Sequence, residues 1–146
     1  MKIYLGSDHA GYDLKEKIKD FLVGEKYSVI DFGADNFSVE DDYPDFIRPV
    51  AEAVADDVDS KGIIFGGSGQ GEAIVANRSR GVRCAVYYGG PKEIITLSRQ
   101  HNDANILSIG ARFVSVDDIV EIINLWLDTD FSQEERHKRR IDKIDM

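Results

Sequence analysis

The chain has 146 residues, of which 42% are hydrophobic and 31% charged, a balance typical of an ordinary globular protein rather than a disordered or fibrous one. This length fits a single domain, residues 1–146, which can bury enough apolar surface to fold without metals or disulfides. The net charge of −9 argues against nucleic acid and anionic membranes as partners. The single cysteine cannot form an internal disulfide, and no apolar run reaches the roughly 20 residues that cross a bilayer, so we expect a cytoplasmic location.

Apolar runs and helical spacing alternate along the chain. The run Ile63–Phe65 has no polar alternation, as expected for a strand that is buried on both faces of a parallel sheet. Ser115 with Asp118, and Ser132 with Glu135, have the spacing of capping boxes, so helices are expected to begin at these serines. The predicted strands are 2–6, 27–32, 62–65, 82–87 and 105–109; helical patterns cover 14–22, 44–54, 73–76, 91–101, 115–127 and 132–146.

Strands that alternate with helices about thirty residues apart imply right-handed crossovers, hence a mostly parallel sheet with helices on both faces. The predicted fold class is α/β, doubly wound and Rossmann-like, with an additional C-terminal helix. In such sheets ligands bind beyond the carboxyl ends of the strands. The loops expected there are 6–11, 66–72, 88–91 and 110–112.

The loop from Gly66 to Glu72 holds four glycines between a buried strand and a helix. Glycines let the backbone turn sharply and bring successive N–H groups close to a ligand oxygen, which indicates an anion nest or oxyanion hole. The spacings of dinucleotide and phosphate loops are absent, and Gln70 breaks the G-x-S-x-G pattern of serine hydrolases. Glu72 has two interpretations, a base whose pKa a closed pocket would raise, or a first-turn carboxylate that favours the helix dipole.

Three further polar groups also have two interpretations each. Asp8–His9 follows the first strand and could act in a site or cap the next helix. His101–Asn102 ends a helix, and alone it indicates a C-terminal cap. Arg136, His137 and Arg140 share roughly one helix face and could grip a phosphate, although cations at a helix C-terminus also suit its dipole.

Several separated motifs nevertheless occur in one order along the chain. They are Gly6–Gly11, Asp42–Pro44, Gly66–Glu72 with Ala76–Asn77, Ser98–Asn105, and Arg136–His137 with Arg140. Together these motifs closely resemble the ribose-5-phosphate isomerase B family over nearly the whole chain. The resemblance implies interconversion of ribose 5-phosphate and ribulose 5-phosphate without a metal or cofactor. Galactose-6-phosphate and allose-6-phosphate isomerases remain alternatives, as does a non-catalytic phosphosugar- or nucleotide-binding module on the same fold.

The resemblance also bears on the base. Many members of the family place a cysteine directly after the buried strand, while another branch uses a glutamate a few residues later. In this chain Gly66 stands at the cysteine position, so the resemblance assigns the base to Glu72. Cys84, inside the apolar run Val82–Val86, is then expected to be a packing residue rather than a reactive thiol.

The same resemblance implies roles for the remaining residues. Asp8 and His101 would assist ring opening, and His9 and His137 would lie near the sugar or the phosphate. The expected oxyanion donors are Ser68 and the amides of Gly67, Gly69 and Gly71; the expected phosphate ligands are Arg112, Arg136 and Arg140; Asn102 would orient the enediolate or a sugar hydroxyl. Because the family builds its pocket between two subunits, we expect at least a homodimer in which His101–Asn102 reaches a neighbour's site. Dimer or tetramer, and a five- or six-carbon substrate, are both left open.

Overall fold

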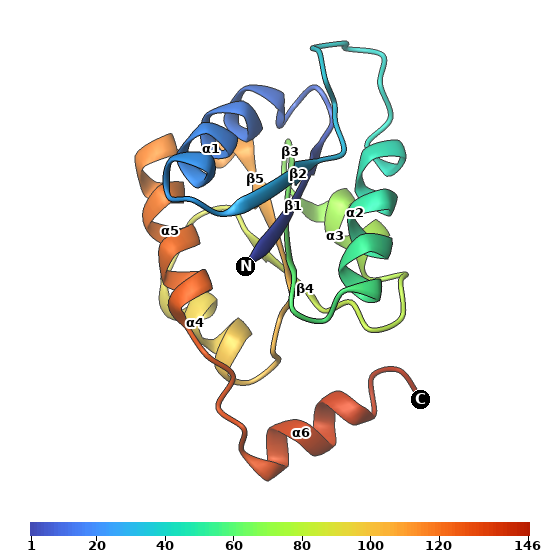
Figure 1. Ribbon diagram of the computed structural model, residues 1–146, viewed down its shortest axis with the longest axis vertical. Helices are drawn as coiled ribbons and strands as arrows, with labels where there is room; N and C mark the ends of the chain where they lie inside the picture. The colour runs from blue at the N-terminus through green and yellow to red at the C-terminus, as the bar shows by residue number, and fades with distance from the viewer.

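The structure, a computed structural model, describes all 146 residues. Its centre is a five-stranded sheet with the strand order β2-β1-β3-β5-β4, in which every neighbouring pair is parallel (Figure 1). The strands are β1 (Lys2–Ser7), β2 (Ser28–Asp31), β3 (Lys61–Gly66), β4 (Cys84–Tyr87) and β5 (Ile106–Gly110). The predicted α/β class with a doubly wound, parallel sheet is confirmed.

Helices cover both faces of the sheet (Figure 1). One layer contains α1 (Tyr12–Gly24), α4 (Glu93–Gln100) and α5 (Val116–Asp128), and the other contains α2 (Pro44–Asp56) and α3 (Gln70–Ala76). A short 3₁₀ helix, Ala111–Phe113, follows β5. None of the helices combines the length and the apolar character that crossing a bilayer requires.

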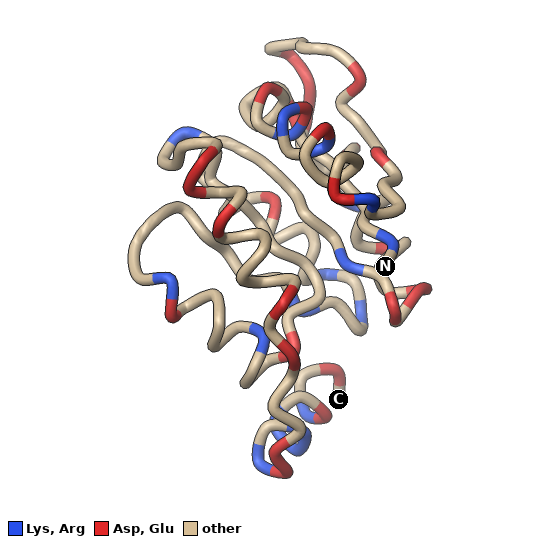
Figure 2. The backbone as a smooth tube through the Cα atoms, turned by 60° about the vertical axis from the view of Figure 1, so that its left-hand side comes forward, with Lys and Arg blue, Asp and Glu red and all other residues tan.

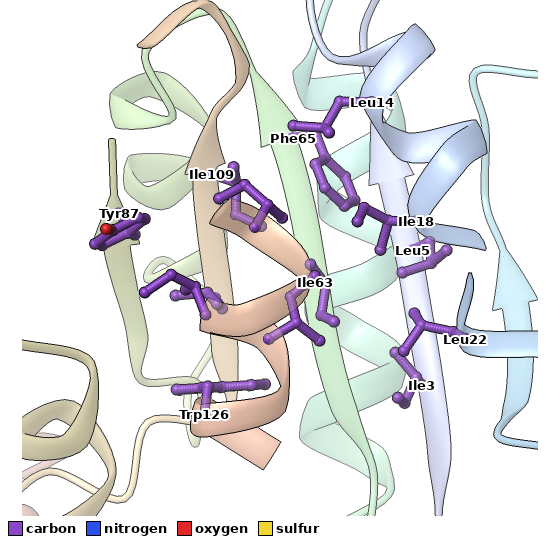
Figure 3. Close-up of a cluster of buried hydrophobic side chains, with 14 of the residues drawn as sticks. Ile3, Leu5, Leu14, Ile18, Leu22, Ile63, Phe65, Tyr87, Ile109 and Trp126 are labelled. Carbon is purple, nitrogen blue, oxygen red and sulfur yellow. The ribbon is translucent and has the colours of Figure 1, made fainter. Parts of the chain in front are cut away.

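The central strand β3 explains why this sequence pattern gives two layers. Ile63 and Phe65 point into the cluster formed with α1, α4 and α5 (Figure 3). Ile64 belongs to the cluster formed with α2. All three side chains are fully buried, so the run needs no polar residue on either face. The larger cluster also encloses Trp126 of α5.

The common strand direction gives the sheet two different edges, which we call the carboxyl edge and the amino edge. The helix that follows each strand runs back from the carboxyl edge, so α4 ends at the amino edge. The last helix, α6 (Glu135–Asp142), lies beyond the amino edge and apart from the two layers (Figure 1). Its flanks are tied there by bonds from Ser132 N–H to Gln100 O (3.1 Å) and from Gly81 N–H to Asp145 Oδ2 (2.9 Å).

The observed strands begin and end within two residues of their predicted bounds. The helix start predicted at Ser115 is confirmed, since Ser115 Oγ accepts the N–H of Asp118 at 3.2 Å and α5 begins at Val116. The second bond of a capping box is absent, because the Asp118 carboxylate accepts the Ser115 hydroxyl (2.7 Å) rather than the Ser115 N–H. This serine satisfies an N–H group that the first turn of the helix leaves without a partner.

The predicted start of the last helix at Ser132 is wrong. The helix begins at Glu135, and Glu134 at its N-cap makes no side-chain capping bond. Ser132 Oγ instead bonds to Nδ1 of His137 at 2.8 Å. The hydroxyl therefore fixes a histidine ring rather than a helix end.

Candidate active site

The loops after β1, β3 and β5 meet at the carboxyl edge because these three strands are neighbours in the sheet. The glycine loop after β3 is held against β5 by two bonds. Arg112 N–H donates to Gly67 O (3.1 Å), and Ser108 Oγ–H donates to Gly69 O (2.6 Å). The loop is thus fixed from one side, and its other side faces the loop after β1.

Glu72 lies in the first turn of α3, and only 4% of it is exposed. Its side chain folds back over Gly66, so that a Cβ atom at position 66 would overlap the carboxylate group. Burial raises the pKa of this carboxyl, and the negative charge of Asp8 raises it further, while a bond from its own backbone N–H acts in the opposite direction. This environment is that of a desolvated acid or base rather than of an exposed first-turn carboxylate.

The backbone of the glycine loop leaves hydrogen-bond donors free. Gly69 has φ 76°, in the left-handed region that glycine adopts without strain. The N–H groups of Gly67, Ser68, Gly69 and Gly71 have no acceptor within the chain. Free amides grouped on one turn can bind an anionic oxygen, which is the property that the sequence predicted for this loop.

Tyr43, at the start of α2, lines the other side of this loop. A Cβ atom on Gly71 would lie 2.8 Å from Cζ of the tyrosine ring, so a larger residue at this position would have to displace the ring. Arg112 lies on the opposite flank, where its guanidinium nitrogen Nη1 is 3.1 Å from the place of a Cβ on Gly67. Arg112 is exposed, so its charge is available beside the free amides.

Asp8 is buried after β1, and its Oδ1 accepts the N–H groups of Ala10 (3.0 Å) and Gly11 (3.3 Å). Both N–H groups precede α1, whose N-cap Gly11 has no side-chain capping bond, so Asp8 stabilises the turn before the helix rather than the helix end itself. The same carboxylate also acts electrostatically on Glu72. His9 beside it pairs through Nδ1 with Oδ1 of Asp41 at 2.6 Å. Sequence reasoning missed Asp41.

The donor atoms of Asp8, His9 and Asp41 lie within 4.8 Å of one another, close enough to hold a metal ion. His9 and Asp41 are already bonded to each other, and one Asp8 oxygen is used by the backbone. Of the three side chains, only those of His9 and Asp41 are hydrogen-bonded to each other.

A second group of predicted site residues lies at the amino edge. The rings of His101 and His137 are 4.2 Å apart between centroids, and 2% of His137 is exposed. Burial lowers the pKa of His137, and the charges of His101 and Arg136 lower it further. Asn102 is exposed, and its carbonyl oxygen accepts Arg83 Nε–H at 3.0 Å.

The cations of α6 are free of strong partners. Arg136 pairs with Glu134 at 2.8 Å, but both side chains are about half exposed, and such a pair contributes little. Arg140 is exposed without an ion pair. Figure 2 shows Lys and Arg gathered on this helix, while Asp and Glu prevail over much of the remaining backbone. An anion could therefore be bound here.

The chain thus brings together only part of the predicted site. We call one set of residues the carboxyl-edge group: Asp8, His9, Gly67, Ser68, Gly69, Gly71, Glu72 and Arg112. The amino-edge group contains His101, Asn102, Arg136, His137 and Arg140. The length of the sheet, about 15 to 20 Å for strands of this size, separates the two groups.

Cys84 lies in β4 on the side of α3, where burial strongly raises the pKa of its thiol. The thiol is therefore kept protonated, which agrees with the expected packing role.

A family model described as Ribose/Galactose Isomerase matches residues 3–144. Ribose-5-phosphate isomerase B of Mycolicibacterium paratuberculosis is 42% identical over 142 residues, which cover 97% of this chain and 88% of that protein. The solved ribose-5-phosphate isomerase B of Clostridium thermocellum has a TM-score of 0.91 at 46% identity, covering 99% of this chain and 95% of that one. The structure from Mycoplasma genitalium with bound ribulose-5-phosphate has a TM-score of 0.92 at 38% identity, covering 98% and 93%. These matches confirm the resemblance seen in the motifs, and the chain belongs to the ribose/galactose isomerase family and is an isomerase.

Proposed function

We propose that the chain interconverts ribose 5-phosphate and ribulose 5-phosphate through an enediolate, with Glu72 as the base. The observation that carries this proposal is the buried carboxylate of Glu72, with its raised pKa, beside a turn of free amides. The relative from Mycoplasma genitalium, with ribulose-5-phosphate bound, supports the choice of a five-carbon substrate. Residues 1–146 act as one isomerase domain in this proposal.

The chemistry requires one group to remove and return a proton. Glu72 takes the proton from carbon 2 of the open-chain aldose, and the C–H electron pair forms the carbon 1–carbon 2 double bond. Negative charge then develops on the carbonyl oxygen of carbon 1. One proton moves from the oxygen on carbon 2 to the oxygen on carbon 1, and Glu72 returns its proton to carbon 1. Such acid–base catalysis typically contributes about 10²- to 10⁴-fold in rate.

The free amides of Gly67, Gly69 and Gly71, together with Ser68, hold the developing oxyanion. A single donor of this kind is worth about 3 kcal/mol where it has been removed from other enzymes. Arg112 binds the phosphate from the flank of the same loop. This remote contact places carbon 2 within reach of Glu72.

A second copy of the chain supplies the remaining groups. Within one chain the amino-edge group lies a sheet length away from Glu72, too far to touch the same sugar. In a homodimer, His101 of one copy works with Asp8 of the other to move protons between the ring oxygen and the anomeric hydroxyl. Arg136 and Arg140 join Arg112 at the phosphate, His137 lies beside them, and Asn102 orients a sugar hydroxyl.

The test of the reaction is an assay of the purified protein on ribose 5-phosphate, allose 6-phosphate and galactose 6-phosphate. We expect the highest kcat/KM on ribose 5-phosphate. The main alternative outcome is a preference for a six-carbon substrate, because the matched family model also covers galactose isomerases. Glu72→Gln should lower turnover about 10²- to 10⁴-fold while sugar phosphate still binds.

Glu93→Gln is the matched control for that variant. Glu93 is also a first-turn helix carboxylate, but it is exposed and hydrogen-bonds to nothing. Turnover should therefore stay at the wild-type level. Equal losses in the two variants would indicate that Glu72 only supports a helix end, and binding without turnover in the wild type would favour the non-catalytic module.

The shared site is tested by mixing two inactive variants, Glu72→Gln and His101→Ala. Each variant damages a different group, so a mixed dimer contains one intact site and one doubly damaged site. Random exchange makes half of the dimers mixed, which restores roughly a quarter of wild-type activity. A mixture that stays inactive, although subunit exchange is demonstrated by mass spectrometry, would contradict a site shared between chains.

A further inference from the structure

One partly buried carboxylate near the carboxyl-edge group has no role in the reaction described so far. Asp41 belongs to the loop between β2 and α2, the extended loop at the top of Figure 1. Its side chain is 11% exposed, and its Oδ1 bonds twice to one residue, His9. It accepts the backbone N–H of His9 at 3.1 Å and pairs with ring Nδ1 at 2.6 Å. Both the backbone and the ring of His9 are therefore tied to one oxygen atom.

The surroundings leave the ring of His9 only one free nitrogen. Phe37 packs edge-on against the ring with 6.0 Å between centroids, and a carboxylate oxygen of Asp8 lies within 4.8 Å of one of the ring nitrogens. A carboxylate can only accept a hydrogen bond, so the proton of the neutral imidazole is on Nδ1. The lone pair of the ring is then on Nε2, and this atom is free to meet a ligand.

We propose that Asp41 is a positioning residue for His9: by binding its backbone and Nδ1 together, it fixes the ring orientation and the tautomer and presents Nε2 to the sugar phosphate. The inference rests on the proposed function in one respect, because it takes His9 to be a substrate contact. The partners are 32 residues apart in the chain, so the same bond also ties the loop over the site to the loop after β1. A carboxylate in this position stabilises a single ring geometry before substrate arrives.

The direct test is the tautomer of His9 in solution. The chain has only three histidines, so long-range ¹H–¹⁵N spectra contain few imidazole signals, and those of His9 are identified by their loss in His9→Gln. In spectra recorded with the imidazoles in their neutral form, wild-type His9 should carry its proton on Nδ1. A proton on Nε2 in the wild type would overturn the proposal without any variant.

Two substitutions of Asp41 separate positioning from simple fastening of the loop. In Asp41→Ala the His9 signals should show a mixture of tautomers, and kcat/KM should fall about 10- to 100-fold, as when the partner of a functional histidine is removed elsewhere. Asp41→Asn keeps an oxygen acceptor for Nδ1–H but loses the charge, so it should retain the tautomer and recover part of kcat/KM. The exposed neighbour Glu40 provides the control, since Glu40→Gln should change neither quantity.

Two results with Asp41→Ala would contradict a positioning role for Asp41. If Asp41→Ala keeps the wild-type tautomer, or loses activity only in proportion to its loss of folded protein, Asp41 fastens the loop and positions nothing. The tautomer measurement requires no turnover. A wild-type protein that is inactive on every sugar phosphate but shows this tautomer would therefore refute the proposed function and leave the His9–Asp41 pairing standing.

Discussion

Replacing Gly66 by alanine should remove most of the turnover and leave the fold intact. A Cβ at position 66 would lie less than 3.0 Å from Oε1, Cδ and Oε2 of Glu72, a distance that real Cβ atoms essentially never show. Since ordinary contact begins near 3.4 Å, the whole carboxylate has to move by about 1 Å or more. A misplacement of about 1 Å can cost 10²-fold, and complete loss of the base costs up to about 10⁴-fold. The expected fall in kcat therefore lies between these limits.

The assay is isomerisation of ribose 5-phosphate, with thermal unfolding measured on the same samples. Gly62→Ala is the matched control because it enlarges the same face of the same strand. Its Cβ would press on Ile106 (3.0 Å) and Val50 (3.1 Å) without touching Glu72. Overpacking of this kind costs about 1–3 kcal/mol of stability, so Gly62→Ala should unfold at a lower temperature and keep its kcat.

Two results would refute this reasoning. If folded Gly66→Ala turns over within about threefold of the wild type, Glu72 is not the base. If Gly62→Ala loses as much kcat as Gly66→Ala, the effect comes from strain in the strand and not from displacement of the carboxylate.

Three further outcomes are expected. Because burial raises the pKa of Glu72, kcat/KM should fall on acidification while the pH is still above the ordinary glutamate pKa of about 4.3; a flat profile down to that pH would contradict the assignment. Lys15→Met should lower the free energy of unfolding, measured in urea, by about 3 kcal/mol, because Lys15 is fully buried and its loss removes one of the cations that pair with Asp31. Burial alone would raise the pKa of Asp31, but bonds from Lys15 and Lys19 hold that pKa below its usual value. The stabilisation that the ionised Asp31 carboxylate provides is therefore present above the ordinary aspartate pKa and is lost as the pH falls below that pKa. Arg136→Ala should raise KM for the sugar phosphate more than it changes kcat, and an unchanged KM would place this exposed arginine outside the site.

Much of the fold could be predicted because local pattern and tertiary burial agree. Ile63–Phe65 is apolar on both faces, and the structure buries it on both faces. The cap at Ser115 involves residues three apart, so spacing alone was sufficient. The same spacing failed at Ser132, because the ring of His137 offered its hydroxyl a better partner than a helix N–H.

The assembly of the site was less accessible from sequence. Asp41 lies in an acidic stretch with no pattern of its own, and its partner His9 is 32 residues away. The position of His101 could have been deduced, since a helix that follows a parallel strand returns to the amino edge of the sheet. This direction places His101 at the amino edge, whereas Glu72, which follows β3, lies at the carboxyl edge of the sheet.

The distance between the two groups has a consequence for how such an enzyme is measured. If a second copy completes the site, as we propose, a folded but isolated chain is inert, and the rate per mole of chain becomes a function of dilution. Specific activity then reports self-association, declining once the protein concentration drops below the dissociation constant of the dimer. Titrating activity against concentration thereby gives that constant directly, without any probe other than the substrate.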